Sequence, residues 1–199
     1  MAIEYINRKD KKYYLHEGKT KTGKPKYFFS MKSNGNLIDS IPKGYEIYEN
    51  PNSQVFLRKI PAKVFTDKEM QTVEEGVRNY AKLDHFIVDV KKNAIIVYLP
   101  DQNIDELASP FSDLLPFSNS PNIRRSLSKL LTYSPMMKFV LEEDAKRREF
   151  VVERWCFRGS IDGWISLDCS TDLKQLAKKY CCHLGKDSFY ELTMFENLL

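Results

Sequence analysis

Long apolar runs, cysteine and histidine are all scarce in this chain of 199 residues. No apolar run reaches the ~18 residues that a membrane-spanning helix needs, so we expect no membrane partner. The N-terminal residues lack the basic region, apolar stretch and cleavage site of a secretory signal peptide, and we therefore expect a cytoplasmic protein. In that reducing compartment the four cysteines are expected to be free thiols. They are Cys156, Cys169, Cys181 and Cys182.

The sequence also lacks the short motifs that identify many cofactor-dependent enzymes. It contains no P-loop, no glycine fingerprint for dinucleotides, no nucleophile elbow, no HExxH zinc motif and no EF-hand loop. We therefore expect no cofactor and favour a protein without enzymatic activity.

Charge is distributed unevenly along the chain, although the formal net charge is only +4. Residues 1–65 contain 13 basic and 6 acidic residues, a net charge of +7, and residues 66–199 carry the remaining −3. We interpret this asymmetry as two domains: a basic, aromatic-rich β module over 1–65, called the head below, and an α+β body over 66–199. The body contains a Pro-rich loop at about residues 100–121. A basic head attracts nucleic acid or an acidic protein surface.

The head has the pattern of short antiparallel strands. Aromatic-rich runs at 12–16 and 26–30 flank a segment whose glycines and proline favour a hairpin. A second hairpin is expected between residues 45–48 and 55–58, around a turn containing Asn-Pro-Asn-Ser. The pattern predicts four short strands.

The second of these hairpins has a family resemblance. Residues 41–56 contain Pro42, Gly44, Tyr45 and Glu46, a Pro-x-Gly-aromatic-Glu run that is followed by a turn and an aromatic strand. This run resembles the opening hairpin of a WW domain. The resemblance implies hairpin geometry without peptide binding, because no third strand with a second Trp and a closing Pro follows.

The body alternates helical and strand patterns, which predicts an α+β fold with antiparallel strands packed on helices. Thr66 and Glu69 have capping-box spacing, and Ser170 or Thr171 is expected to cap the last helix. Helices are expected over 66–82, 121–132 and 172–183. Strands are expected over 85–90, 94–99, 136–142, 149–157 and 163–167.

Large apolar side chains are expected to anchor the body. We expect Trp155 and Trp164 to contribute to its core and the C-terminal residues to dock onto it. The docking residues are Phe189, Leu192, Phe195 and Leu198.

The first hairpin holds the main candidate binding residues, because basic residues interleaved with aromatics are typical of proteins that bind single-stranded nucleic acid. These candidates are Lys12, Tyr14, Lys19, Lys21, Lys24, Lys26, Tyr27 and Phe29. The leading hypothesis is a non-enzymatic binding or adaptor protein whose head engages nucleic acid or an acidic partner. The competing interpretation is that the aromatics form the core of a small sheet and the lysines keep its edge soluble.

A different class of function is suggested by Asp89 and Lys91. Their Asp-x-Lys spacing at the end of an apolar strand resembles the second motif of the restriction-type PD-(D/E)xK nucleases. The resemblance implies a metal-dependent hydrolase using Asp89 and Lys91, in which Asp84 or Glu74 would have to supply the family's missing upstream carboxylate. A third hypothesis is a self-associating structural protein, whose sign would be an exposed apolar patch on the C-terminal tail.

The cysteines, with His183, raise the possibility of a zinc site. Structural zinc sites usually combine Cys-x2-Cys pairs, and this chain has none. Cys181 also falls on the apolar stripe of the last helix, where a small core residue is expected. We therefore expect no metal site, and we expect His16 and His85 to be structural residues within strands.

Overall fold

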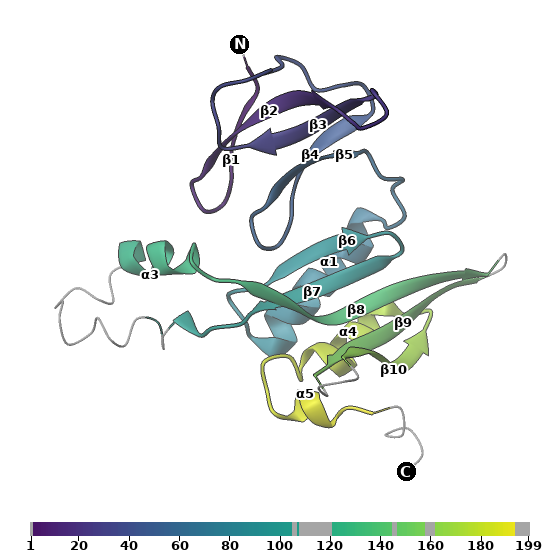
Figure 1. Ribbon diagram of the computed structural model, residues 1–199. Helices are drawn as coiled ribbons and strands as arrows, with labels where there is room; N and C mark the ends of the chain where they lie inside the picture. Colours follow the sequence, from purple (N-terminus) through teal and green to yellow (C-terminus); the bar gives the residue numbers. More distant parts are fainter. Residues whose placement is uncertain (1, 105–106, 108–120, 145–146, 158–161, 194–199) are drawn as a thin grey trace. The chain divides into compact units, whose positions relative to one another are not determined.

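The computed structural model describes residues 2–104, 107, 121–144, 147–157 and 162–193 (Figure 1). The predicted α+β class is confirmed, because antiparallel sheets of three, two and five strands occur together with helices. The chain forms two compact units: unit 1 contains Met1–Ala62 and Gln102–Thr132, and unit 2 contains Lys63–Asp101 and Tyr133–Leu199. The division into domains 1–65 and 66–199 stays a prediction, and most of the Pro-rich loop lies outside the described residues.

Unit 1 contains two small sheets. Its three-stranded sheet has the order β1-β2-β3, and β4 pairs with β5 in a separate hairpin. Both predicted hairpins are confirmed, but the prediction of four strands was one short, since β1 joins the first sheet. Three residues are too few to show an alternating pattern. The strands are β1 (Glu4–Ile6), β2 (Lys12–Lys19), β3 (Pro25–Ser30), β4 (Tyr45–Glu49) and β5 (Val55–Lys59).

Residues that are far apart in the sequence make contacts that hold β1 in place. The Tyr5 hydroxyl donates to Oε2 of Glu49 at 3.0 Å, and Nε of Arg8 donates to Oε1 of the same carboxylate at 2.7 Å. Burial alone would raise the pKa of Glu49, but these hydrogen bonds outweigh it and hold that pKa below its ordinary value. Glu49 therefore ties β1 to the second hairpin.

Unit 2 is built on one antiparallel sheet of order β10-β9-β8-β7-β6. The strands occur close to the predicted ranges: those expected over 85–90 and 94–99 pair as a hairpin, and those expected over 136–142, 149–157 and 163–167 pair in order as a meander. The hairpin and the meander form one continuous sheet, because β7 pairs with β8 from Pro100 and Tyr133 onward. The strands are β6 (Ile87–Lys91), β7 (Ala94–Pro100), β8 (Tyr133–Asp144), β9 (Arg147–Cys156) and β10 (Gly163–Ser170).

The first helix of unit 2 begins as predicted and ends differently. The capping box is present: Oγ1 of Thr66 accepts from the Glu69 amide at 3.2 Å, and Oε2 of Glu69 accepts from the Thr66 amide at 2.7 Å. The α-helix α1 spans Asp67–Gly76, and Val77–Ala81 then form the π-helix η1 in place of the expected continuous helix.

The cap of the last long helix, α4 (Leu173–Cys181), corrects a prediction. Neither Ser170 nor Thr171 is its N-cap; Oδ1 of Asp172 accepts from the Gln175 amide at 3.1 Å. Ser170 instead accepts from the amide of Asp172 at 3.0 Å and so supports the cap. The remaining helices are α3 (Pro121–Ser128) in unit 1 and α5 (Ser188–Glu191) in unit 2. Across the described ranges, no helix is long and apolar enough to cross a membrane.

The main core lies between the helices of unit 2 and one face of the five-stranded sheet (Figure 1). Buried Val73, Val77 and Leu176 from the helices pack with Ile95 and Phe139 from the strands. This arrangement leaves the opposite face of the sheet to a smaller cluster around Ala94, Ile96 and Tyr98, against which Trp164 packs half-buried. Trp155 is also half-buried, and its ring lies edge-on to Trp164 at a centroid distance of 5.2 Å.

The C-terminal segment docks through an arginine. Phe189 and Leu192 are buried, as expected, and Nε of the buried Arg154 donates to the Leu192 carbonyl at 2.7 Å. Phe195 and Leu198 lie outside the described residues. Tyr190 is 55% exposed, and self-association through this segment stays a prediction.

Candidate functional site

The turn between β2 and β3 has a defined geometry. The Thr20 carbonyl accepts from the Gly23 amide at 2.9 Å, and Oγ1 of Thr20 accepts from the Lys24 amide at 3.1 Å. Gly23 has a φ of +79°, a left-handed conformation that favours glycine. A turn of this kind, closed by a left-handed glycine, is a common three-residue hairpin loop. The loop therefore fixes the backbone from which the neighbouring lysines project.

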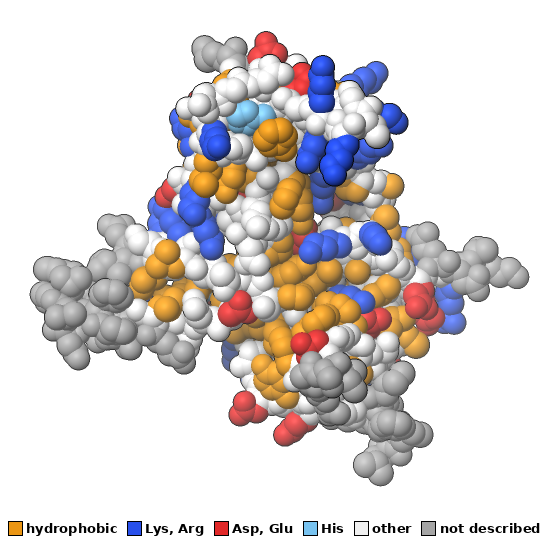
Figure 2. Space-filling view, viewed as in Figure 1, with side chains coloured by type: hydrophobic (Ala, Val, Ile, Leu, Met, Phe, Trp, Pro, Cys, Tyr) orange, Lys and Arg blue, Asp and Glu red, His pale blue; other side chains and the backbone are white. Residues whose placement is uncertain are grey.

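Lysine side chains are concentrated on this hairpin. Residues 19–26 contain four lysines and no acidic residue, and all four lysines are exposed. We call them the hairpin lysines: Lys19, Lys21, Lys24 and Lys26. Figure 2 shows Lys and Arg side chains gathered where β2 and β3 join.

Among the described residues, the hairpin lysines have no carboxylate partner, unlike several other cations of unit 1. Lys12 pairs with Glu4 at 2.9 Å, and Arg58 pairs with Glu46 at 2.8 Å. Within the described part of the chain, no ion pair involves a hairpin lysine. Their positive charge is therefore free to act on a ligand.

The strand register divides the candidate residues between two faces of the sheet. His16 pairs with Phe28 and Leu15 pairs with Phe29, so alternate residues of β2 and β3 point to opposite sides. Lys12, Tyr14 and Lys26 share the face of Phe28, whereas Lys19, Tyr27 and Phe29 share the face of Leu15. Lys21 and Lys24 lie in the loop. The structure thus brings the candidates to one hairpin but not to one face.

The face of Leu15 belongs to the packed interior of the head. Leu15 is fully buried, and the half-buried rings of Tyr27 and Phe29 lie 6.2 Å from Tyr45 and 6.5 Å from Tyr5, respectively. On this face, the aromatics therefore belong to the core of a small sheet, as the competing interpretation expects.

The opposite face presents an exposed ring that the candidate set omitted. Phe28 is 40% exposed and stacks on His16 with a centroid distance of 5.3 Å and an angle of 10° between the rings. His16 is buried, as expected for a structural histidine, and its Nε2 lies 3.0 Å from the Lys32 carbonyl oxygen. His85, by contrast, lies exposed before β6 rather than within a strand. In the sequence, Phe28 could have been identified as a candidate because it follows Lys26 by two residues, which places both side chains on one face of a strand.

A hollow of about 280 Å³ lies beside the hairpin. Two of its lining residues carry charge, Glu17 and Lys19, and two are glycines, Gly18 and Gly23. Asn36 also lines it, and the backbone oxygen of Asn36 accepts from the Glu17 amide at 2.9 Å. The hollow gives the hairpin a concave surface next to its cations.

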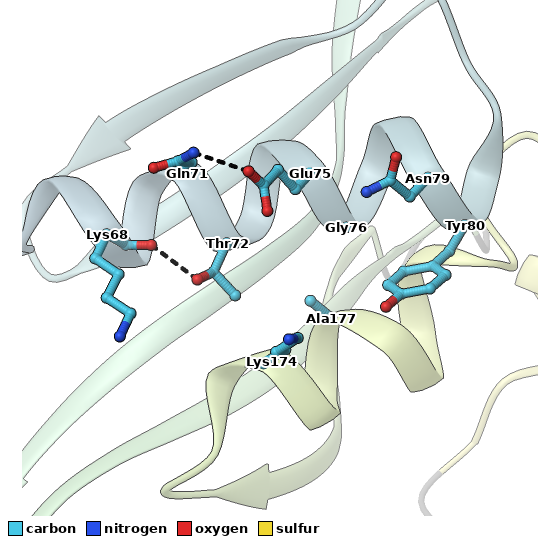
Figure 3. Close-up of a pocket in the computed structure, with 9 residues that line it drawn as sticks. All are labelled: Lys68, Gln71, Thr72, Glu75, Gly76, Asn79, Tyr80, Lys174 and Ala177. Atoms are coloured by element: carbon cyan, nitrogen blue, oxygen red, sulfur yellow. Dashed lines mark hydrogen bonds between the residues drawn. The ribbon is translucent and has the colours of Figure 1, made fainter.

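Unit 2 has a second concave surface, a groove of about 420 Å³ between α1, η1 and α4 (Figure 3). Polar side chains line it: Gln71 donates to Glu75 at 2.8 Å, and the Thr72 hydroxyl donates to the Lys68 carbonyl at 2.8 Å. Tyr80 is half-buried and also lines the groove. This groove could not be predicted from local patterns, because its walls come from helices about a hundred residues apart. Its lining suits a small polar molecule.

Asp89 and Lys91 lie together on β6 and face away from the helices. Asp89 pairs with Ile96, a residue of the sheet face opposite the main core. Glu74 is on α1, which packs on the other face, and Asp84 lies in a bend before β6. The structure therefore does not bring Glu74 to Asp89, and the hydrolase alternative stays a prediction.

The four cysteines are free and differ in accessibility. Cys156 and Cys181 are buried, Cys182 is half-buried and Cys169 is exposed. The predicted core position of Cys181 is confirmed, and burial raises the pKa of its thiol to about 12. Nδ1 of His183 lies 3.0 Å from Oγ of Ser188. Among the residues that the structure describes, no three His, Cys, Asp or Glu side chains come together as metal ligands.

Comparisons with known proteins add no functional information: no family model, no curated protein and no solved structure matches this chain. A functional proposal therefore depends on the geometry and charge of the sites described above.

Proposed function

We propose that this protein is a cytosolic, non-enzymatic binding or adaptor protein whose basic head engages a polyanion, either nucleic acid or the acidic surface of a partner protein. The observation that supports the proposal is the set of four exposed hairpin lysines without carboxylate partners.

Unpaired lysines on a tight hairpin suit a polyanion for two reasons. First, each lysine that contacts a phosphate releases a condensed counterion, which contributes favourable free energy at low salt. Second, no internal ion pair has to be broken before the lysines bind, in contrast to Lys12 and Arg58. The closed turn at Gly23 further limits how much backbone order must be gained on binding.

The test measures binding by the full-length protein across a salt series. The ligands are fluorescent single-stranded and duplex oligonucleotides of about 15 nucleotides, an oligomer length that covers one small-domain site. Labelled poly-glutamate represents an acidic protein surface. The test variant changes all four hairpin lysines to Gln. A control variant removes the same charge from unit 2 through Lys68→Gln, Lys92→Gln, Lys174→Gln and Lys178→Gln.

The proposal expects the wild type and the control variant to bind at least one of these polyanions, with an affinity that falls steeply with salt. If each lysine meets one phosphate of a single strand, the hairpin variant should reduce the slope of log affinity against log salt by about 3. Equal binding by the hairpin and control variants, or no binding of any polyanion at about 50 mM salt, would overturn the proposal.

A further inference from the structure

We infer that the ligand of the head is a single-stranded nucleic acid and that Phe28 is the side chain on which one of its bases stacks. This inference rests on the proposed function, because the hairpin lysines would hold the phosphates. It adds the class of ligand and a specific aromatic contact.

The Phe28 ring is held in place before any ligand binds. One side of it stacks on buried His16, whose own ring nitrogen contacts the Lys32 carbonyl. Its edge lies over Gly18, where a Cβ atom would be 3.3 Å from Cε1 of Phe28. The ring is nonetheless 40% exposed. A fixed ring with an open side loses little side-chain entropy when a base stacks on it.

The position of the ring relative to the lysines also fits a nucleotide chain. Lys26 lies two residues before Phe28 on the same strand and on the same face, about 7 Å away along the strand. A base on Phe28 would therefore leave its phosphate within reach of the flexible Lys26 side chain. The loop lysines, Lys21 and Lys24, continue the positive charge beyond the end of the strand.

The aromatic ring distinguishes between possible polyanions. An acidic protein surface would use the lysines, and its carboxylates do not need the exposed ring of Phe28. A duplex offers phosphates, but its bases are stacked on one another and are not available to a side chain. Single strands offer both phosphates and free base faces, and stacking of this kind is tolerant of sequence.

The experiment compares two probes that carry the same charge. One is a labelled oligothymidine of about 15 nucleotides, and the other is an abasic oligomer of the same length, which keeps the phosphates but lacks the bases. Full-length wild type, Phe28→Leu and Phe28→Tyr are titrated with both. Phe56→Leu is the matched control, because Phe56 is similarly exposed, at 45%, on the other hairpin. Circular dichroism of each variant confirms that it folds.

The expected result is that wild type binds oligothymidine about tenfold or more tightly than the abasic oligomer, and that Phe28→Leu removes this difference. Phe28→Tyr, which keeps an aromatic ring, should restore it, and Phe56→Leu should leave it unchanged. Any of three results would overturn the inference. Wild type could bind the two probes equally, folded Phe28→Leu could bind oligothymidine as tightly as wild type does, or wild type could bind poly-glutamate more tightly than oligothymidine. These outcomes would not contradict the proposed function. If wild type shows no salt-dependent binding of any polyanion, both the proposed function and this inference are wrong.

Discussion

Gly76 of α1 lies so close to Ala177 of α4 that a Cβ atom on Gly76 would be 2.9 Å from the Cβ of Ala177. Glycine within a helix is unfavourable by about 0.5 to 1 kcal/mol relative to alanine. Here the absence of a side chain allows the two helices to approach closely beneath the groove of Figure 3, where both residues line the floor.

Gly76→Ala should therefore destabilise the protein despite alanine's higher helix propensity. The added methyl group overlaps Ala177, and overpacking of this kind costs about 1 to 3 kcal/mol. Urea denaturation followed by circular dichroism measures the change. Gly163→Ala is the control, because a Cβ on Gly163 meets nothing within 4 Å and its φ is not left-handed. Equal stability of the two variants would show that α1 and α4 can move apart freely.

Glu49 should make the stability of the protein depend on pH. Its folded-state pKa lies below the ordinary value of 4.5, so its contribution is present above about pH 4.5 and is lost as the pH falls through the lowered folded pKa. Glu49→Gln should cost about 1 to 2 kcal/mol at neutral pH, because charge-assisted hydrogen bonds from Arg8 and Tyr5 are weakened.

The difference in unfolding free energy between wild type and Glu49→Gln should shrink on acidification. Urea denaturation at neutral pH and at about pH 3 measures it. Glu4→Gln serves as the comparison, since the Glu4 side chain is 48% exposed and its ion pair with Lys12 contributes little. If the difference in unfolding free energy between wild type and Glu49→Gln is the same at both pH values, the role given to Glu49 is contradicted.

Thiol reactivity should distinguish Cys169, Cys182 and Cys181 in the native protein. Exposed Cys169 should react quickly with a thiol reagent, and half-buried Cys182 more slowly. Cys181 should react only on unfolding, because burial raises its pKa to about 12 and excludes the reagent. The time course of labelling measures this, and Cys169→Ser should remove the fast phase. Fast labelling of Cys181 in native protein would show that the core near α4 opens readily.

Gly23→Ala should weaken the β2–β3 hairpin. A left-handed backbone costs alanine about 1 kcal/mol more than glycine, whereas asparagine tolerates it better. Thermal unfolding should therefore rank wild type above Gly23→Asn and Gly23→Ala last. If Gly23→Ala melts with the wild type, the loop has adopted a different turn.

Local patterns predicted those parts of the fold that depend on neighbouring residues. The capping box of Thr66 and Glu69 needs only three residues of spacing, and the hairpins follow from strands joined by short turns. The cap of α4 shows the limit of this reasoning. Ser170, Thr171 and Asp172 are all capable caps, and burial of Leu173 and Leu176 selects the register in which Asp172 has that role.

Features that depend on distant contacts could not be predicted in the same way. The three residues of β1 are held through Tyr5 and Glu49, which are 44 positions apart. The exposed side of Phe28 depends on its pairing with His16, since either of two neighbouring phenylalanines could have been the outer one. Interleaved charge and aromatics therefore drew attention to this hairpin but did not show which of its rings face outward.

The pairing of Pro100 with Tyr133 means that the chain leaves the five-stranded sheet and re-enters it at adjacent positions. Residues 101–132 are thus an insertion within a continuous meander, and Gln102–Thr132 group with the N-terminal residues in unit 1. The cost of closing such an excursion grows only slowly with its length. Evolution could therefore lengthen, shorten or exchange this segment without altering the sheet, whereas cutting the chain after Ala62 would divide one compact unit between two polypeptides.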